Sequence, residues 1–146
     1  MPIKQLEPPQ AYEAMKSTTG AVYLDVRTEA EFAQGHPTGA LNVPVVFIKG
    51  PGQMQPNADF AEVVEKVIPR DTPLIVGCMA GGRSQRACEI LEEAGYTNLT
   101  NVRGGYGGAR DASGSIVTPG WREAGLPVSN DLGEAAYQAL RAKAGL

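Results

Sequence analysis

Short apolar runs recur along the chain, each bordered by Gly, Pro or charged residues. They lie at 22–26 and 74–77 and are rich in Val, Ile and Leu, and two shorter segments with apolar ends follow Gly39 and Asn98, at 40–43 and 99–102. A run of this length and composition is typical of a strand that is buried on both faces of a sheet. We therefore expect a buried strand at 22–26, further strands at 40–43, 74–77 and 99–102, and a short edge strand at 3–6.

Several segments between these runs have the features of helices. Two of them, 59–68 and 85–94, carry apolar residues three and four positions apart, which is helical spacing. Two earlier segments have recognisable helix starts: paired prolines begin one of them, and Thr28 can form a capping box with Glu31 in the other. We expect helices over 8–16, 29–34, 59–68 and 85–94.

Strands that alternate with helices in this way predict an α/β domain. We expect a mainly parallel central sheet flanked by helices on both faces, with ligands bound beyond the carboxyl ends of the strands. Irregular loops are expected at 44–57 and 109–118. The alanine-rich segment at about 131–144 predicts a C-terminal helix, because Asp131 near its start and Arg141 near its end suit the helix dipole.

Composition and charge limit the class of protein. With 146 residues, 42% hydrophobic and 20% charged, the chain fits a single soluble domain over 1–146. The net charge of −3 argues against a general nucleic-acid binder, which needs a basic face. Residues 1–7 lack the apolar core of a signal peptide, and no segment reaches transmembrane length. We expect a cytoplasmic protein with no nucleic-acid or membrane partner.

The chain has two cysteines, Cys78 and Cys88, and one histidine, His36. Two cysteines do not suggest a disulfide framework, and no cluster of ligands suits a metal. Cys88 lies on the apolar stripe of a predicted helix, so we expect a packed core residue there, and the alternative is a resolving thiol for Cys78. The sequence thus predicts no metal and no cofactor, and any covalent chemistry would use a bare thiol.

The segment after the apolar run at 74–77 carries the strongest chemical signal. A cysteine at a strand end, followed by two glycines and a helix start, favours a thiolate, because backbone N–H groups and the helix N-terminus surround the sulfur. We predict that Cys78 is a nucleophile. The residues expected to cradle its sulfur and to bind the substrate are Met79, Ala80, Gly81, Gly82, Arg83 and Ser84.

Charged and polar side chains near this segment are candidates for supporting roles. Arg83 is placed to bind an anionic substrate or to stabilise the thiolate, and Ser84 to cap the next helix or to donate to the sulfur. Asp25 and Arg27 follow a strand at the same edge of the sheet, where we expect a buried ion pair that braces the loop or, alternatively, a part in donor binding. Arg86 would extend the positively charged entrance of the site.

Four blocks of sequence, taken together, resemble a known family. They are the segment 24–32, which begins Leu-Asp-Val-Arg, then Gly-His-Pro-Thr-Gly-Ala-Leu-Asn-Val-Pro at 35–44, Cys-Met-Ala-Gly-Gly-Arg-Ser at 78–84, and the paired glycines at 104–105 with Trp121 and 124–128. In this order they resemble the single-domain rhodaneses. The resemblance implies the rhodanese fold, a structural role for His36, and sulfur transfer through a persulfide on Cys78. It further implies thiosulfate as a donor that releases sulfite, and cyanide or a thiol as the acceptor.

The chain departs from this family after Gly105. Family members have a tryptophan a few residues later, whereas Trp121 here comes after an insertion at about 106–120. Because the insertion leaves the edge of the sheet that carries Cys78, we expect it to border the site through Tyr106 or Arg110; a surface decoration is the alternative. The C-terminal helix could pack on this domain or on a second copy, so a monomer and a homodimer both stay open.

Two other functions stay open as alternatives. Protein tyrosine phosphatases place a cysteine and an arginine around a similar backbone cradle, with five residues between them. Four residues separate Cys78 from Arg83 here, and the smaller ring suits a single sulfur atom better than a phosphatase or arsenate reductase substrate. The second alternative is a non-catalytic rhodanese-like binding or sulfur-carrier module, although such modules usually lack the cysteine.

Overall fold

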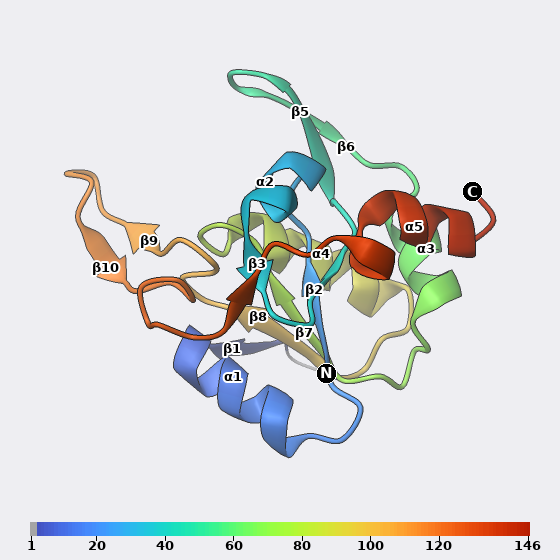
Figure 1. The fold of residues 1–146 in the computed structure, drawn as a ribbon, viewed down its shortest axis with the longest axis horizontal. Coiled ribbons are helices and arrows are strands. Elements are labelled where there is room, and N and C mark those ends of the chain that lie inside the picture. Colours follow the sequence, from blue (N-terminus) through green and yellow to red (C-terminus); the bar gives the residue numbers. More distant parts are fainter. Residues whose placement is uncertain (1–2) are drawn as a thin grey trace.

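The computed structural model describes residues 3–146 and has a five-stranded sheet at its centre (Figure 1). All strand pairs in it are parallel, in the order β1-β8-β7-β2-β4. The predicted α/β fold with a parallel sheet is confirmed; Met1 and Pro2 of the predicted domain lie outside the described residues. The strands are β1 Lys4–Leu6, β2 Val22–Asp25, β4 Leu41–Asn42, β7 Leu74–Gly77 and β8 Leu99–Val102.

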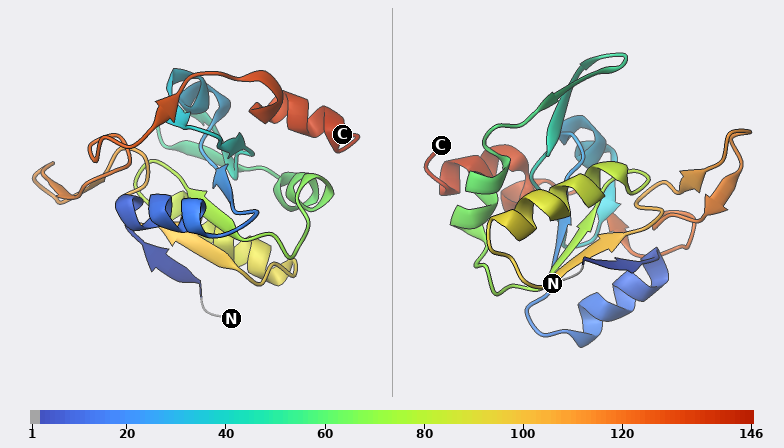
Figure 2. Two further views of the ribbon diagram at one scale, coloured as in Figure 1. Left: turned by 60° about the horizontal axis from the view of Figure 1, so that its bottom comes forward. Right: turned by 180° about the vertical axis from the view of Figure 1, so that it is seen from behind.

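Helices cover both faces of the sheet, as the sequence predicts. Alternate side chains of a strand point to opposite faces: Leu24 and Val76 pack with residues of α3, α4 and α5, whereas Tyr23 and Ile75 pack with residues of α1 and α2. Figure 2 shows α1 and α4 on opposite sides of the sheet. The helices are α1 Pro8–Ser17, α2 Glu29–Gln34, α3 Phe60–Val67, α4 Gly82–Glu93 and α5 Tyr137–Lys143.

Both segments predicted to be irregular loops contain antiparallel hairpins instead. Strands β5 Val46–Gly50 and β6 Gln53–Pro56 pair within 44–57, and β9 Ala109–Arg110 pairs with β10 Ile116–Thr118. The sequence pattern does not reveal these hairpins, because their turns are rich in Gly, Pro, Asp and Ser, residues that are also typical of loops. Asp111 closes the second turn by accepting the N–H groups of Ser113 and Ser115. Both hairpins project from the body of the molecule (Figure 1).

The C-terminal helix is shorter than the predicted span at 131–144. A short 3₁₀ turn, η1 Gly133–Ala135, comes first, and α5 begins at Tyr137. Gly133 has a φ of +48° and Ala136 is extended, so a continuous helix from Asp131 cannot form. Upstream, β11 Val128–Ser129 pairs with β3 His36–Pro37. No helix within residues 3–146 is both long and apolar enough to span a membrane.

Candidate active site

Cys78 lies between the end of β7 and the start of α4, with only 2% of its surface exposed. The N–H of Gly81 donates to the Cys78 Sγ at 3.1 Å, and the Ser84 Oγ lies 3.4 Å from the same sulfur. Gly81 has a φ of +121°, a conformation that favours glycine. The loop therefore turns a backbone donor toward the thiol, as the pattern at 78–84 predicts.

The helix after this loop begins three residues earlier than predicted, at Gly82 rather than at 85. Arg83 and Ser84 consequently lie in the first turn of α4 and not in the loop. The predicted cradle of backbone N–H groups is thus shorter, and Gly81 supplies its hydrogen bond to the sulfur. The N-terminus of a 12-residue helix adds positive potential beside the thiol.

Backbone hydrogen bonds connect the segment after β8 to the Cys78 loop and support it. The N–H of Tyr106 donates to the carbonyl of Cys78 at 2.8 Å, and the N–H of Gly107 donates to the carbonyl of Met79 at 2.9 Å. A Cβ on Gly105 would collide with both of these carbonyl oxygens. The paired glycines of the sequence therefore allow two backbone segments to approach closely.

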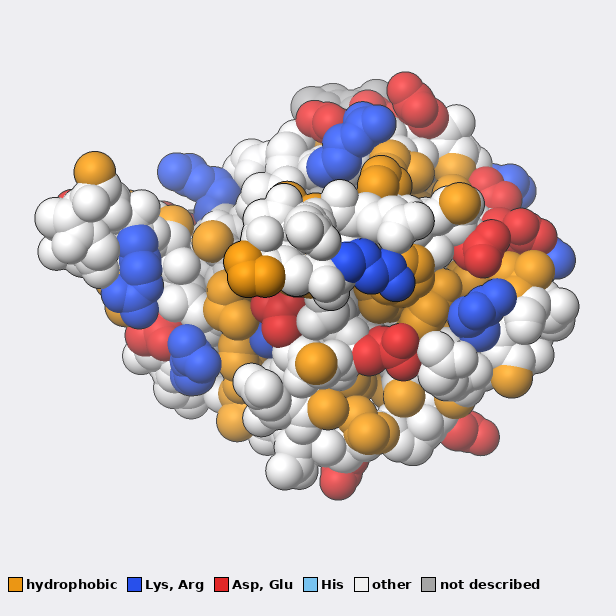
Figure 3. Space-filling view, turned by 90° about the horizontal axis from the view of Figure 1, so that it is seen from above, with side chains coloured by type: hydrophobic (Ala, Val, Ile, Leu, Met, Phe, Trp, Pro, Cys, Tyr) orange, Lys and Arg blue, Asp and Glu red, His pale blue; other side chains and the backbone are white. Residues whose placement is uncertain are grey.

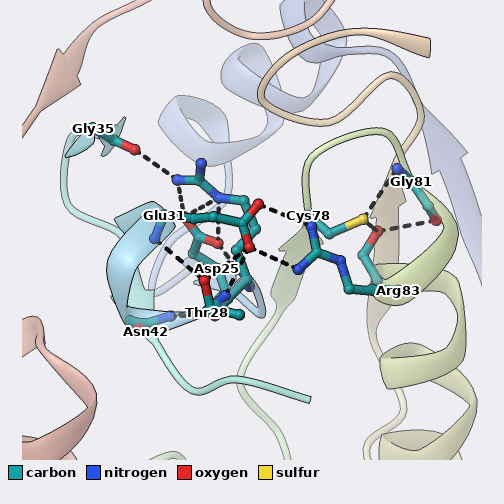
Figure 4. Close-up of polar contacts among 10 residues, drawn as sticks. Asp25, Thr28, Glu31, Gly35, Asn42, Cys78, Gly81 and Arg83 are labelled. Atoms are coloured by element: carbon teal, nitrogen blue, oxygen red, sulfur yellow. Dashed lines mark hydrogen bonds and ion pairs between the residues drawn. The ribbon is translucent and has the colours of Figure 1, made fainter. Parts of the chain in front are cut away.

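Arg83 forms a two-pronged ion pair with Glu31 of α2 (Figure 4). The two nitrogen–oxygen distances are 2.8 and 3.1 Å, and Thr28 donates its backbone N–H and its hydroxyl to the same carboxylate. Burial raises the pKa of Glu31, but the hydrogen bonds from Arg83 and Thr28 outweigh it and lower this pKa to about 2. The guanidinium predicted to bind a substrate anion is thus also held by a carboxylate of the protein.

Asp25 and Arg27 form the predicted buried ion pair. The Arg27 guanidinium donates to the Asp25 carboxylate at 2.7 to 3.2 Å and to the carbonyl of Gly35 at 2.7 Å. Burial lowers the pKa of Arg27, but the hydrogen bond with Asp25 and the nearby negative charges of Asp25 and Glu31 together outweigh burial and raise this pKa. The guanidinium also lies 4.4 Å from the centre of the Tyr106 ring, so the pair braces the segment that supports the Cys78 loop.

A cavity of about 510 Å³ opens over the thiol. Cys78 lines it together with residues of its own loop and of α4, and the β5–β6 hairpin supplies an apolar wall. Met54 of that hairpin is 61% exposed, and Figure 3 shows exposed hydrophobic side chains on the end of the molecule that bears the hairpin. The wall residues are Val45, Val46 and Met54, and the opposite side has Met79, Ala80, Gly82, Arg83 and Arg86.

The other predicted supporting residues differ in how closely they approach the thiol. Arg86 is exposed, lies 3.4 Å from Glu89 and lines the cavity. Tyr106 borders the loop through its contact with Arg27 and lines a smaller cavity beside Met79. Arg110 instead donates to the carbonyl of Gly114 within the β9–β10 hairpin. Of the two residues proposed to connect the insertion with the site, the contacts favour Tyr106.

Cys88 and His36 both have structural surroundings. Cys88 is fully buried in α4, and burial raises its pKa to about 12. His36 is buried, stacks on the ring of Phe32, and places Nδ1 2.8 Å from the Phe32 carbonyl oxygen. Residues 3–146 contain no group of three or more His, Cys, Asp or Glu side chains that could hold a metal ion.

Three features of the site were not predicted from the sequence. They are the ion pair of Glu31 with Arg83, the β5–β6 hairpin in place of the expected loop, and the hydrogen bond of Asn101 with Ser84. Asn101 lies on β8, is 4% exposed, and accepts a hydrogen bond of 2.5 Å from Ser84. The available signal is a polar side chain within a predicted strand of the central sheet, since a polar side chain that is buried there needs a hydrogen-bond partner.

Known proteins resemble this chain in sequence and in structure. The family model for the Rhodanese-like domain matches residues 8–112. Thiosulfate sulfurtransferase GlpE of Haemophilus influenzae is 31% identical over 128 residues, which cover 88% of this chain and 96% of that protein. The crystal structure of Rv0390 from M. tuberculosis is similar with a TM-score of 0.74 and 33% identity, covering 90% of this chain and 100% of that one.

A plant relative has higher identity over a shorter stretch. Protein HIGH ARSENIC CONTENT 1, mitochondrial, of Arabidopsis thaliana is 46% identical over 95 residues. The match covers 65% of this chain but only 56% of the plant protein. The chain therefore spans little more than half the length of that relative.

Proposed function

Because this chain belongs to the family of rhodanese-like domains, we propose that it is a sulfurtransferase that carries sulfur as a persulfide on Cys78. The donor is a small anionic sulfur compound of the thiosulfate type. The acceptor is a thiol, for which cyanide substitutes in an assay. Cys78 is the nucleophile, and the Gly81 N–H and the N-terminus of α4 stabilise its thiolate.

The reaction has two displacement steps. In the first, the Cys78 thiolate attacks the outer sulfur of thiosulfate; a new S–S bond forms while the S–S bond of thiosulfate breaks, and sulfite leaves with the electron pair. In the second, the acceptor thiolate attacks the terminal sulfur of the persulfide. The product persulfide forms, and Cys78 returns as a thiolate. The two steps balance without any further oxidant or reductant.

One observation carries the proposal: a backbone donor 3.1 Å from the Cys78 sulfur, at a helix N-terminus that opens on a cavity of about 510 Å³. Donors fixed where negative charge gathers stabilise that charge without reorganising during the reaction. A guanidinium has five N–H groups, so the bonds from Arg83 to Glu31 leave others for an anionic donor. The apolar wall of the β5–β6 hairpin suits the carbon skeleton of a thiol.

Turnover of thiosulfate and cyanide to thiocyanate tests the assignment of the nucleophile. Cys78→Ser should reduce turnover by about a thousand-fold or more, because the hydroxyl is a far weaker nucleophile than a thiolate. Cys88→Ala is the matched control, since it removes the other thiol, and should retain turnover. A Cys78→Ser protein that is folded by circular dichroism and keeps near-wild-type turnover would contradict the proposal.

Arsenate reduction is a second candidate, favoured by one observation: the 46% identical relative is named for arsenic content. Reducing arsenate to arsenite takes two electrons, which two thiols supply as they form a disulfide. We expect the purified protein, given arsenate and a thiol, to form no arsenite above the rate without protein, while it uses thiosulfate. Arsenite formation that depends on Cys78 and exceeds thiocyanate formation would favour the second candidate.

A further inference from the structure

A chain of side-chain hydrogen bonds leads from the surface of α4 to the thiol. The Gln85 amide donates to Glu89 at 3.4 Å, and the Gln5 amide donates to Gln85 at 2.7 Å. The Asn101 amide donates to Gln5 at 2.9 Å, and the Ser84 hydroxyl donates to Asn101 at 2.5 Å. The last hydroxyl lies 3.4 Å from the Cys78 sulfur. Thus α4, β1 and β8 are connected at the site.

Glu89, at the charged end of this series, sets the donor and acceptor of each hydrogen bond. An ionised carboxylate only accepts hydrogen bonds, so Glu89 must face an NH₂ group of Gln85. Gln85 then presents its oxygen to Gln5, which presents its own oxygen to Asn101. The Oδ1 of Asn101 is consequently the atom that faces Ser84, and it can only accept a proton.

Ser84 has one hydroxyl proton and three acceptors within reach. Asn101 Oδ1 is at 2.5 Å, the Gly81 carbonyl at 3.2 Å, and the Cys78 sulfur at 3.4 Å. The shortest of these contacts takes the proton, and the lone pairs of the Ser84 oxygen then face the sulfur. In this state Ser84 accepts the S–H of Cys78 and stabilises the thiol over the thiolate, in opposition to the N–H of Gly81.

We propose that Asn101 is a positioning residue that holds the Ser84 proton away from Cys78 and so restrains formation of the thiolate. This inference rests on the proposed role of Cys78 as the nucleophile. Asn101 acts through Ser84 and does not touch the sulfur itself. Its side chain is 4% exposed, and Ser84 is fully buried, so water does not compete readily for either group.

The other titratable groups around the thiol are not members of this series of hydrogen bonds. α4 contributes two arginines and a cysteine, β2 contributes a tyrosine, and α2 contributes the carboxylate bound to Arg83. The charged group within the chain itself is Glu89, which is exposed on α4. The surrounding groups are Arg83, Arg86, Cys88, Tyr23 and Glu31, and the ion pair of Asp25 with Arg27 lies beside them at the end of β2.

Alkylation of Cys78 by iodoacetamide, measured across pH by peptide mass spectrometry, tests the proposal without any sulfur donor. In Asn101→Leu the Gly81 carbonyl and the Cys78 sulfur stay within reach of the Ser84 proton. Once the sulfur is charged it takes this proton, because a hydrogen bond to a charged acceptor is stronger than one between neutral groups. The midpoint of the profile should move to lower pH. The alkylation rate on the acid side of the midpoint should rise roughly three- to ten-fold, which is the change that the free energy of one hydrogen bond produces.

Two further variants show whether the effect passes through the hydroxyl. In a Ser84→Ala background, adding Asn101→Leu should change nothing, because the coupled pair is already broken. Gln5 lies on the exposed strand β1, away from the core. Gln5→Leu should move the midpoint of the alkylation profile in the same direction by a smaller amount, because it releases the Asn101 amide. Gln138→Leu, which removes an exposed amide bonded to Glu29, is the control and should leave the profile unchanged.

An unchanged or alkaline-shifted profile in both Asn101→Leu and Gln5→Leu would overturn the proposal. An equal shift from Asn101→Leu with and without Ser84 would overturn it as well. Because alkylation needs no thiosulfate, a protein that shows the predicted shift but no sulfur transfer would contradict the proposed function alone.

Discussion

At Glu31, burial and ion pairing shift the pKa of the carboxyl group in opposite directions. Burial raises its pKa, whereas the guanidinium of Arg83 and the two donors of Thr28 lower it to about 2, against an ordinary value of 4.5. The ionised form is therefore favoured by folding. This single group connects the cap of α2 with the first turn of α4 and with the active-site cavity.

The stability of the protein should depend on Glu31 in a defined pH range. A lowered pKa contributes stability that is complete above about pH 4.5 and is lost as the pH falls toward about 2. The free energy of unfolding of wild type should exceed that of Glu31→Gln by about 3 kcal/mol or less at pH 6. The difference should shrink steadily in urea titrations at pH 4 and pH 3.

Glu62→Gln is the matched control for this measurement. Its carboxylate pairs with Lys66 on the exposed face of α3, with both side chains about half exposed, and such pairs contribute little. The Glu62→Gln difference should stay small at every pH. A Glu31→Gln difference that stays constant between pH 6 and pH 3 would show that its carboxylate has no lowered pKa.

The sequence predicts residues whose partners lie close in the chain better than those whose partners are distant. Asp25 and Arg27 are two positions apart, and their ion pair was expected. Arg83 and Glu31 are 52 positions apart, and Ser84 and Asn101 are 17 apart. Nothing in the local pattern joins these pairs, because packing of α2 and β8 against the Cys78 loop brings them together.

At the scale of elements, the segment after β8 determines the shape of the Cys78 loop. Gly105→Ala should destabilise the protein by about 2 kcal/mol or more and reduce turnover, because the added methyl group collides with the carbonyls of Cys78 and Met79. Gly114→Ala is the control: Gly114 also has a positive φ, of +86°, but a Cβ there meets open space.

The comparison of these two variants separates the effect of backbone strain at a positive φ from the effect of a collision with a neighbouring segment. Both lose the freedom of glycine at positive φ, whereas only Gly105→Ala adds a collision with the backbone of Cys78, the proposed nucleophile. Thermal unfolding and thiocyanate formation measure the two effects. Equal losses in Gly105→Ala and Gly114→Ala would refute the supporting role of the segment after β8.

The β5–β6 hairpin should influence the acceptor more than the donor. Met54→Ala removes part of the apolar wall and should raise KM for a carbon-bearing thiol acceptor a few-fold, the effect of losing apolar contact. KM for cyanide should change little, because cyanide is too small to reach the wall. Gln55→Ala, on the neighbouring and exposed position of β6, is the control; an equal effect from both variants would contradict this role.

The elements that sequence patterns predict well are the buried ones. The segments that form β2, β7 and β8 match the observed strands closely, since burial on both faces favours apolar residues along most of a strand; Thr100 and Asn101 are polar positions within β8. The two hairpins lack that signal because they are exposed and rich in turn residues. The terminal helix was overestimated because alanine content favours a helix, whereas Gly133 and Ala136 interrupt it.

At the scale of the whole molecule, the charged side chains at the cavity differ in sign from the net charge of the protein. The chain carries a net charge of −3, yet Arg83 and Arg86 line the cavity over the thiol. The sheet accounts for this arrangement, because its parallel strands end at one edge and the loops beyond them meet there. An acidic protein thereby places two guanidinium groups, each also paired with a carboxylate, at the partly apolar pocket where we propose that the anionic donor binds.

The most direct test of the account is the intact mass of the purified, reduced protein after brief incubation with thiosulfate. The account predicts a gain of one sulfur atom, located on Cys78 by peptide mapping, and its loss on addition of cyanide or a thiol. The gain should be absent in Cys78→Ser and present in Cys88→Ala. A folded wild-type protein that gains no sulfur on Cys78 would contradict the central claim.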